Sequence, residues 1–279
     1  MTESGPRPTP LPLPLPSPTS QVDRGEKLLW ESAARTDVGR VRDHNEDVFL
    51  MRPDLGLFMV CDGMGGYSAG EVAASIAAET TQEFFESCRR DPEGTWPFKA
   101  EDALGEEGSR LTVALKLANQ RIRLAAQGDP RKHNMGTTAV AVFLEQERTY
   151  VAHAGDSRAY MFRDGQLKAV TADHSLLGEF IRNQHPTPEE IQAFPYKNVI
   201  NRALGPANDV KIDSRPIEMR AGDVLLLCCD GLHGMMGDDT IAQILWTYPY
   251  LEDASRALVD SANAAGGTDN ITVVLVRRH

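Results

Sequence analysis

The stretch Val224-Leu-Leu-Leu-Cys-Cys-Asp-Gly231 places an acid and a glycine directly after six consecutive apolar residues. A short apolar run of this length is typical of a buried strand, and a carboxylate at its end needs a compensating partner. Two other places repeat the arrangement: Phe58-Met-Val-Cys61 leads into Asp62, and Asp269 precedes the run from Ile271 to Val276. If these strand ends meet in the fold, several carboxylates share one site.

A shared site of this kind implies a bound cation. Two like charges ~4 Å apart repel by ~4 kcal/mol at an effective dielectric of ~20, so a positive charge is needed between them. Oxygen-only ligands suit Mg²⁺ or Mn²⁺ rather than zinc. A fourth acidic segment, Arg42-Asp-His-Asn-Glu-Asp47, is a candidate for the same site, and the glycines of Asp62-Gly-Met-Gly-Gly66 permit a tight turn whose carbonyl can reach an ion.

Composition narrows the class of protein. The chain has 279 residues, enough for one large domain or two small ones. Its net charge of −11 argues against a nucleic-acid or anionic-membrane surface. We expect no transmembrane helix and no signal peptide, because the required apolar stretches are absent from the sequence. The four cysteines have no metal-type spacing, and those in apolar runs are expected to be buried free thiols, which favours a cytoplasmic location.

Residues 1–24 differ from the rest of the chain. Proline occupies every second position from Pro6 to Pro18, a low-complexity pattern that blocks helix and sheet and favours extended polyproline II. We expect a disordered tail, with a docking ligand for a partner as the alternative. From Leu28 to His279 the sequence is globular and predicts one domain.

The globular part predicts an α+β fold. Expected strands cover residues 48–51, 57–61, 137–144, 148–154, 158–163, 167–171, 210–217, 223–229 and 271–277, with a hairpin at Asp164-Gly165. Expected helices follow a capping box at Ser68-Ala-Gly-Glu71, run from about Gly108 to Gln127, cover 175–182 and 188–193, and cover 238–246 and 252–264. Strict strand–helix alternation is absent, so antiparallel sheets are favoured over a doubly wound parallel sheet.

Several other chemistries find little support. A dinucleotide loop at 62–66 would need glycine at position 68, where serine stands, and would set Asp62 against a pyrophosphate. The sequence contains no Gly-x-x-x-x-Gly-Lys loop and no Cys-x₅-Arg, and its one Gly-x-Ser-x-Gly match, at Gly66–Gly70, overlaps the glycine segment that follows Asp62. The seven histidines show no zinc-site spacing. Catalysis through a serine or cysteine nucleophile is therefore disfavoured.

Taken in order, the motifs resemble those of metal-dependent serine/threonine protein phosphatases of the type 2C family, in its bacterial branch. The resemblance extends from about Ala33 to Val276. It rests on Gly39-Arg-Val-Arg-Asp-His-Asn-Glu-Asp47, Asp62-Gly-Met-Gly-Gly66, Gly136-Thr-Thr138, Ala152-His-Ala-Gly-Asp-Ser-Arg-Ala-Tyr160, Thr171-Ala-Asp-His-Ser175, Ile200-Asn-Arg-Ala-Leu-Gly205, Asp230-Gly-Leu232 and Gly267-Thr-Asp-Asn-Ile-Thr-Val-Val274. A single motif would be weak, whereas eight in the correct order are specific.

The resemblance implies a four-layer α-β-β-α sandwich, with a flap at about residues 172–208, that hydrolyses phosphoserine and phosphothreonine in proteins. Two Mn²⁺ or Mg²⁺ ions would lower the pKa of a bridging water, and the resulting hydroxide would attack phosphorus. The resemblance also implies a role for each site residue. Asp62 bridges both ions, the Gly63 carbonyl binds one of them, Asp230 and Asp269 hold the first ion, and Glu46 and Asp47 support the second through water. Asp156 binds a weak third ion together with Asp230, and Arg42 binds the substrate phosphate.

The sequence departs from the family pattern at two positions. Met64 stands where some members carry a histidine that could act as a general acid, and Gly234 stands where many carry an acid that could serve the third ion. The expected partners are phosphorylated proteins, namely serine/threonine kinases or their substrates, and we expect a monomer that reverses kinase signalling. Two alternatives remain open: a catalytically weak regulatory relative, and a hydrolase of a different phosphoester.

Overall fold

The computed structural model describes residues 29–279, apart from 67–68, 102, 133 and 146–147. The proline-rich tail predicted for residues 1–24 lies outside the described residues, as does the Ser68 capping position. All four cysteines are buried and carry free thiols, as expected for those in the apolar runs. None of the described helices is long and apolar enough to cross a membrane.

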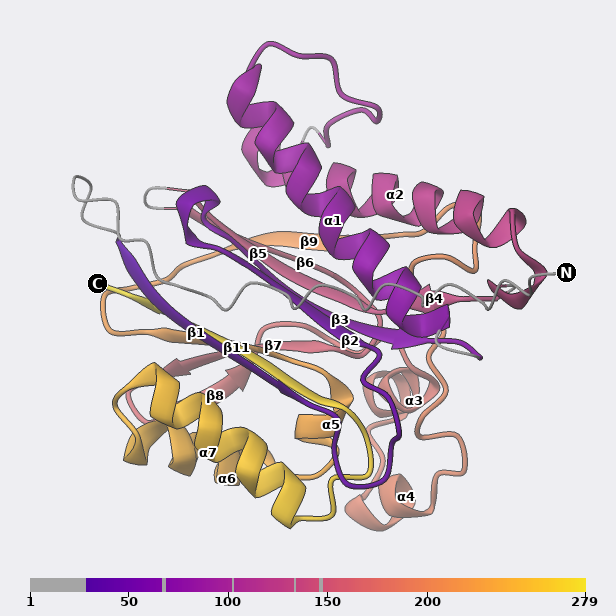
Figure 1. Ribbon diagram of the computed structural model, residues 1–279. Coiled ribbons are helices and arrows are strands. Elements are labelled where there is room, and N and C mark those ends of the chain that lie inside the picture. The colour runs from indigo at the N-terminus through magenta and orange to yellow at the C-terminus, as the bar shows by residue number, and fades with distance from the viewer. Residues whose placement is uncertain (1–28, 67–68, 102, 133, 146–147) are drawn as a thin grey trace, which may run out of the picture.

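Two antiparallel sheets form the centre of the molecule (Figure 1). The first has the order β1-β11-β10-β7-β8, and the second has the order β2-β3-β5-β6-β9 with β4 paired to β3. The strands of the first sheet are β1 (Trp30–Asp37), β7 (Arg158–Arg163), β8 (Gln166–Ala169), β10 (Val224–Cys228) and β11 (Ile271–Arg278). Those of the second are β2 (Asp47–Arg52), β3 (Leu57–Met64), β4 (Gly136–Thr137), β5 (Ala139–Glu145), β6 (Arg148–Ala154) and β9 (Asp213–Ile217).

Helices cover the outer faces of both sheets. The pair α1 (Ala69–Arg90) and α2 (Gly105–Gln127) packs on the second sheet, and the pair α6 (Asp238–Thr247) and α7 (Leu251–Ala264) packs on the first (Figure 1). The shorter helices are α3 (Leu176–Gln184), α4 (Pro188–Ala193), α5 (Asp230–His233), η1 (Pro53–Leu55) and η2 (Pro130–Lys132). Figure 1 shows α3 and α4 beside one end of the sandwich rather than in its layers.

Three apolar clusters match the three interfaces between these layers. One joins α1 and α2 to the second sheet, around Phe85, Leu115 and Phe143. Another lies between the two sheets and includes Phe58 of β3 and Leu225 of β10. The last joins the first sheet to α6 and α7, through Leu226 and Leu258. The predicted α+β fold and its four-layer arrangement are therefore confirmed.

Local signals in the sequence explain several boundaries. Asp164 and Gly165 have φ of 51° and 78°, the left-handed pair that a two-residue hairpin turn requires. The Thr187 side chain accepts a hydrogen bond from the Glu190 amide, and the Glu190 side chain accepts one from the Thr187 amide. This is the predicted capping box, and α4 begins there. Strand β1 was not expected. Its sequence, Trp-Glu-Ser-Ala-Ala-Arg-Thr-Asp, is poor in β-branched residues, and Ala33 is its one fully buried side chain.

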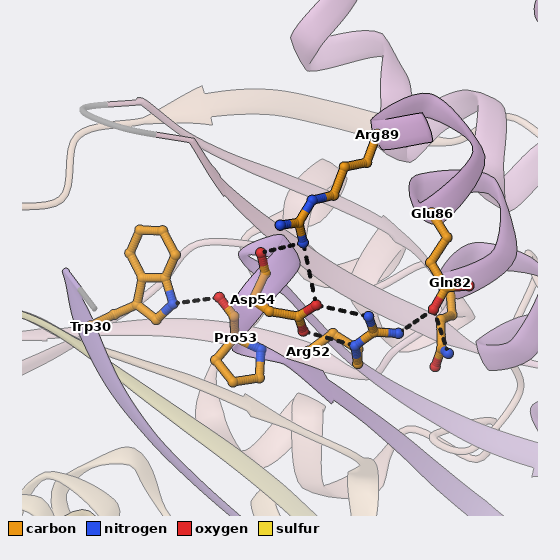
Figure 2. Close-up of polar contacts among 7 residues, drawn as sticks. All are labelled: Trp30, Arg52, Pro53, Asp54, Gln82, Glu86 and Arg89. Atoms are coloured by element: carbon orange, nitrogen blue, oxygen red, sulfur yellow. Dashed lines mark hydrogen bonds and ion pairs between the residues drawn. The ribbon is translucent and has the colours of Figure 1, made fainter. Parts of the chain in front are cut away.

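Arginine and acid side chains form ion pairs and hydrogen bonds at the end of the sandwich where β1 begins (Figure 2). The Arg52 guanidinium makes two hydrogen bonds of 2.8 Å to the Asp54 carboxylate and also pairs with Glu86 of α1. Arg89 approaches the same Asp54 carboxylate from α1 at 3.5 Å. The Trp30 indole donates to the Pro53 carbonyl at 3.2 Å, which links the start of β1 to η1, the connection between β2 and β3. We call the residues Arg52, Asp54, Glu86 and Arg89 the paired cluster.

Candidate active site

The strand ends that carry acids converge at the opposite end of the sandwich. They surround a pocket of about 760 Å³, which we call the acidic pocket. Asp62 reaches it from β3, Asp230 from the first residue of α5 directly after β10, and Asp269 from the turn before β11. Other predicted site residues that line it are Arg42, Glu46, Gly63 and Asp156. Asp47 does not line the pocket and lies buried behind it.

Backbone pairing on both sides of β3 fixes Asp62 and Gly63. Asp62 stands opposite Asp47 of β2, so the two carboxylates lie on the same face of the sheet. The Asp62 amide donates to Thr138 Oγ1 at 3.1 Å, and its carbonyl accepts from the Thr138 amide at 2.9 Å. A side chain at Gly63 would place its Cβ 2.3 Å from the Gly70 carbonyl oxygen. Only glycine fits there, because the end of β3 lies directly against the first turn of α1.

Asn270 holds the loop that carries Arg42 and Glu46. Its side-chain oxygen accepts from the Glu46 amide at 2.8 Å, and its Nδ2 donates to the carbonyls of Val38 and His44 at 2.9 and 2.8 Å. Asn270 was assigned no role of its own from the sequence. The available signal was an Asp-Asn pair just before a strand, where an amide side chain can both donate to and accept from a neighbouring loop.

The carboxylates of the pocket destabilise one another's charged forms. Burial, followed by the charges of Asp47 and Asp230, raises the pKa of Asp62 well above its ordinary value. Burial and the neighbouring Asp269 charge likewise raise the pKa of Asp230. Burial raises the pKa of Asp47 to about 7, and the side chain of Asp47 leaves its Oδ2 without a hydrogen-bond partner among the described residues. A set of buried acids in this state is what a divalent cation would relieve.

Arg42 lies at the rim and contacts Asp269. Its Nη2 donates to Asp269 Oδ2 at 2.7 Å, and this bond, followed by the charge of Asp269, raises the pKa of the guanidinium. The Arg42 side chain is 55% exposed, so the ion pair stands in solvent and is weak. The guanidinium therefore stays free to exchange Asp269 for another anion in the pocket.

Asp156 lies in the turn between β6 and β7, beside α5. Burial and the Asp230 charge raise its pKa to about 7. His233 Nε2 lies 3.1 Å from the Asp156 carbonyl oxygen, and burial lowers the pKa of His233 to about 4, so the ring is neutral. Gly234 packs with its Cα against α5, where an added Cβ would meet the Asp230 carbonyl oxygen at 2.8 Å. An acid at position 234, which many members of the family carry, would therefore require the backbone here to shift.

A buried histidine fastens the segment 172–208 to the Asp156 turn. The amide of Gly155 donates to His174 Nδ1 at 3.2 Å, and His174 Nε2 lies 3.1 Å from Asp213 Oδ2 and 2.8 Å from Arg202 Nη1. The His174 ring stacks on His153 with centroids 4.4 Å apart. Burial and the neighbouring His153 lower the pKa of His174 to about 4, which keeps the ring neutral. The base of the predicted flap is thus tied to the pocket wall.

The oxygen donors of the acidic pocket fit Mg²⁺ or Mn²⁺ better than they fit a metal whose ligands are all side chains. Among the described residues, no group of three or more His, Cys, Asp or Glu side chains is arranged to hold an ion. A small hard cation keeps several waters and takes one or two carboxylates, so it needs no such group. Asp62, Gly63 and Asp230 line the same pocket, and the Asp230 charge contributes to the raised pKa of Asp62. These oxygen donors, and the Asp47 oxygen without a hydrogen-bond partner, fit a cation held by few carboxylates and several waters.

Comparison with known proteins gives a consistent result. The model of the protein phosphatase 2C family matches residues 37–177. The serine/threonine phosphatase stp of Listeria monocytogenes is 36% identical over 247 residues, covering 88% of this chain and 94% of the relative. The serine/threonine phosphatase PstP/Ppp of Mycobacterium tuberculosis has a TM-score of 0.79 at 32% identity, covering 90% of this chain and 100% of that one. A catalytic domain of PstP solved with 2 manganese ions has a TM-score of 0.75 at 32% identity, covering 89% and 97%.

Proposed function

The chain belongs to the protein phosphatase 2C family, and we propose that its acidic pocket hydrolyses phosphoserine and phosphothreonine in proteins with the help of divalent cations. One observation carries the proposal. Buried carboxylates that raise one another's pKa stand in an open pocket, with an exposed guanidinium at its rim. Such a pocket attracts cations to its wall and a phosphate to its rim.

We assign the cation ligands to the residues at the strand ends. Asp62 would hold both ions and the Gly63 carbonyl one of them. Asp230 and Asp269 would hold the first ion, and Glu46 and Asp47 would support the second through water. When bound, such ions supply a water of lowered pKa and offset the charge on the phosphoryl oxygens. The related PstP domain, solved with 2 manganese ions, supports Mn²⁺ as the first ion to test, with Mg²⁺ as the alternative.

The substrate phosphate falls to Arg42 in this proposal. Its guanidinium presents a planar fork that matches two phosphate oxygens. The pairing with Asp269 holds the fork at the rim of the pocket, and its exposure allows it to turn toward a phosphate that enters from solvent. Asp156, at the far side of Asp230, would take part in a weak third site.

Two alternatives predict different results from the same assay. An inactive relative would have lost core acids of the acidic pocket, and this chain retains Asp62, Asp230 and Asp269. A hydrolase of another phosphoester would keep the pocket and differ in the surface around the segment 172–208. The acidic pocket therefore favours catalysis, and the similarity to serine/threonine phosphatases favours phosphoserine and phosphothreonine as the esters.

The test is hydrolysis of matched peptides carrying phosphothreonine, phosphoserine or phosphotyrosine, with Mn²⁺ and after chelation. We expect turnover of the first two peptides that is lost on chelation and restored by Mn²⁺. The matched control is Asp54→Asn, which changes an acid of the paired cluster and should leave turnover intact. Turnover that survives chelation would refute the metal-dependent mechanism, and turnover of phosphotyrosine alone would refute the substrate class.

We propose phosphorylated serine/threonine kinases or their substrates as partners, since these proteins carry the ester that the pocket accepts. A cytoplasmic location is supported by four buried free thiols, which are typical of a reducing compartment. A monomer stays our expectation for the oligomeric state.

A further inference from the structure

A run of exposed aromatic residues joins α6 to α7. Residues 246–250, Trp-Thr-Tyr-Pro-Tyr, are all exposed, and we call them the aromatic loop. Trp246 is 71% exposed, Tyr248 42% and Tyr250 70%. Within the part of the chain that the structure describes, these three side chains make neither a side-chain hydrogen bond nor a ring stacking contact. Aromatic faces grouped in this way on a surface mark a binding site more often than scattered ones do.

The aromatic loop lies where the described chain begins. Arg277 of β11 donates from Nη2 to the Pro249 carbonyl at 2.6 Å, and its Nη1 pairs with Glu31 of β1 at 3.3 Å. At the other side, the ring of Trp246 lies against Gly165 in the β7–β8 hairpin, at 3.4 Å from the place of a Cβ. The loop therefore crosses the end of the first sheet where β1 starts and β11 ends (Figure 1). The acidic pocket is at the other end of the same strands.

The segment that precedes β1 has the chemistry to cover this loop. Residues 6–18 alternate proline with other residues, which favours polyproline II. Such segments bind grooves lined by aromatic side chains, with proline rings on the aromatic faces and free carbonyls accepting from tyrosine or tryptophan. The connecting residues 19–29 can extend over roughly 35 Å, ample for a surface that begins beside Glu31.

Charge favours the same pairing. Arg7 is the sole charged residue between Ser4 and Val22, so the proline run carries one positive charge at its start. Next to Tyr250, the first turn of α7 presents Glu252 and Asp253, both exposed. An arginine beside a polyproline segment and acids beside an aromatic surface are complementary in charge, which favours an orientation with Arg7 toward the start of α7.

We propose that residues 6–18 of this chain dock on the aromatic loop of the same molecule as a polyproline II segment. The contact covers Trp246 and Tyr250 and sets Arg7 against the acids at the start of α7. It leaves the acidic pocket open, because that pocket is at the opposite end of the sheet. The aromatic loop is then an internal docking site for the proline-rich segment and has no part in hydrolysis.

Hydroxyl-radical footprinting of the full chain tests this docking. The comparison is between the native chain and a full-length variant carrying Pro8→Ser, Pro10→Ser, Pro12→Ser, Pro14→Ser and Pro16→Ser. We expect Trp246 and Tyr250 to be oxidised about threefold more slowly in the native chain, since a docked aromatic ring hides most of its surface. Tyr196, which is 57% exposed and lies in the segment 172–208, is the internal control and should react equally in both.

A second variant approaches the contact from the other side. Tyr250→Ser with Trp246→Ala, in a full chain labelled with a nitroxide at a Ser17→Cys position, should increase the mobility of the label. Equal oxidation of Trp246 in the native and proline-substituted chains, or equal label mobility with and without the aromatic side chains, would refute the docking. Protection that grows with protein concentration would also overturn it, since a second copy would then supply the segment.

Discussion

Acidic side chains gather at both ends of this sandwich, and the two gatherings differ in what neutralises them. In the paired cluster, hydrogen bonds from Arg52 lower the pKa of Asp54 and of Glu86. In the acidic pocket, burial and neighbouring acids raise the pKa of Asp62, Asp156 and Asp230. The residue types are the same. What differs is the number of arginines within reach and the amount of water.

This difference separates a structural role from a functional one. The carboxylates of the paired cluster have their charge compensated in the folded chain, because each pairs with an arginine. Those of the pocket have one exposed arginine at the rim, so their charge stays uncompensated until a cation enters. Variants at matched positions in the two clusters should therefore give opposite patterns of activity and stability.

The largest expected effect is the loss of activity in Asp62→Asn. Asparagine nearly preserves the volume of the side chain and removes the charge that would hold the cations. We expect phosphopeptide turnover at saturating Mn²⁺ to fall by about three orders of magnitude or more. Asp54→Asn, the matched variant in the paired cluster, should keep turnover within about twofold, as a surface change far from the pocket. Near-normal turnover in Asp62→Asn would remove this residue from the metal site.

Arg42 should give a smaller effect, seen mainly in KM. Its proposed contact with the phosphate exists before the reaction begins, so losing it weakens substrate binding. We expect Arg42→Ala to raise KM for a phosphothreonine peptide by roughly tenfold, and Arg42→Lys to recover part of this, because an ammonium cannot make the forked contact. An unchanged KM in Arg42→Ala would mean that the pairing with Asp269 is its whole role.

Asp156 tests how far the pocket extends beyond its central acids. Gly234 offers no carboxylate, so a third cation would depend on Asp156, Asp230 and water, and would bind weakly. Asp156→Ala should leave the tighter phase of Mn²⁺ binding unchanged by calorimetry and lower turnover by roughly tenfold at high Mn²⁺. Full activity of this variant over the whole range of metal concentration would show that the site is dispensable.

The sequence predicted the pocket better than it predicted the other end of the molecule. Apolar runs ending in Asp62 and Asp230 carry a strong local signal, because a carboxylate beside a buried strand is rare without a reason. Strand β1 carries no such signal, since its pairing with β11 over residues far apart in sequence decides its conformation. The role of Asn270 was missed for the same reason, because its partners Val38 and His44 lie more than two hundred residues away.

The smallest effect contrasts the stability of the same two variants in the absence of metal. At neutral pH in chelator, a carboxylate whose pKa is raised by folding opposes the folded state, so Asp62→Asn should raise the melting temperature. Asp54 has its pKa lowered by Arg52 and is half exposed, so Asp54→Asn should lower stability by no more than about 1 kcal/mol.

Adding Mn²⁺ should raise the melting temperature of the native chain and of Asp54→Asn, and have a much smaller effect on Asp62→Asn, since a ligand stabilises the state that binds it. Thermal unfolding followed by circular dichroism, with and without Mn²⁺, gives all the required values. If Asp62→Asn melts below the native chain in chelator, the carboxylates of the pocket are already compensated within the protein, and the contrast between the two clusters fails.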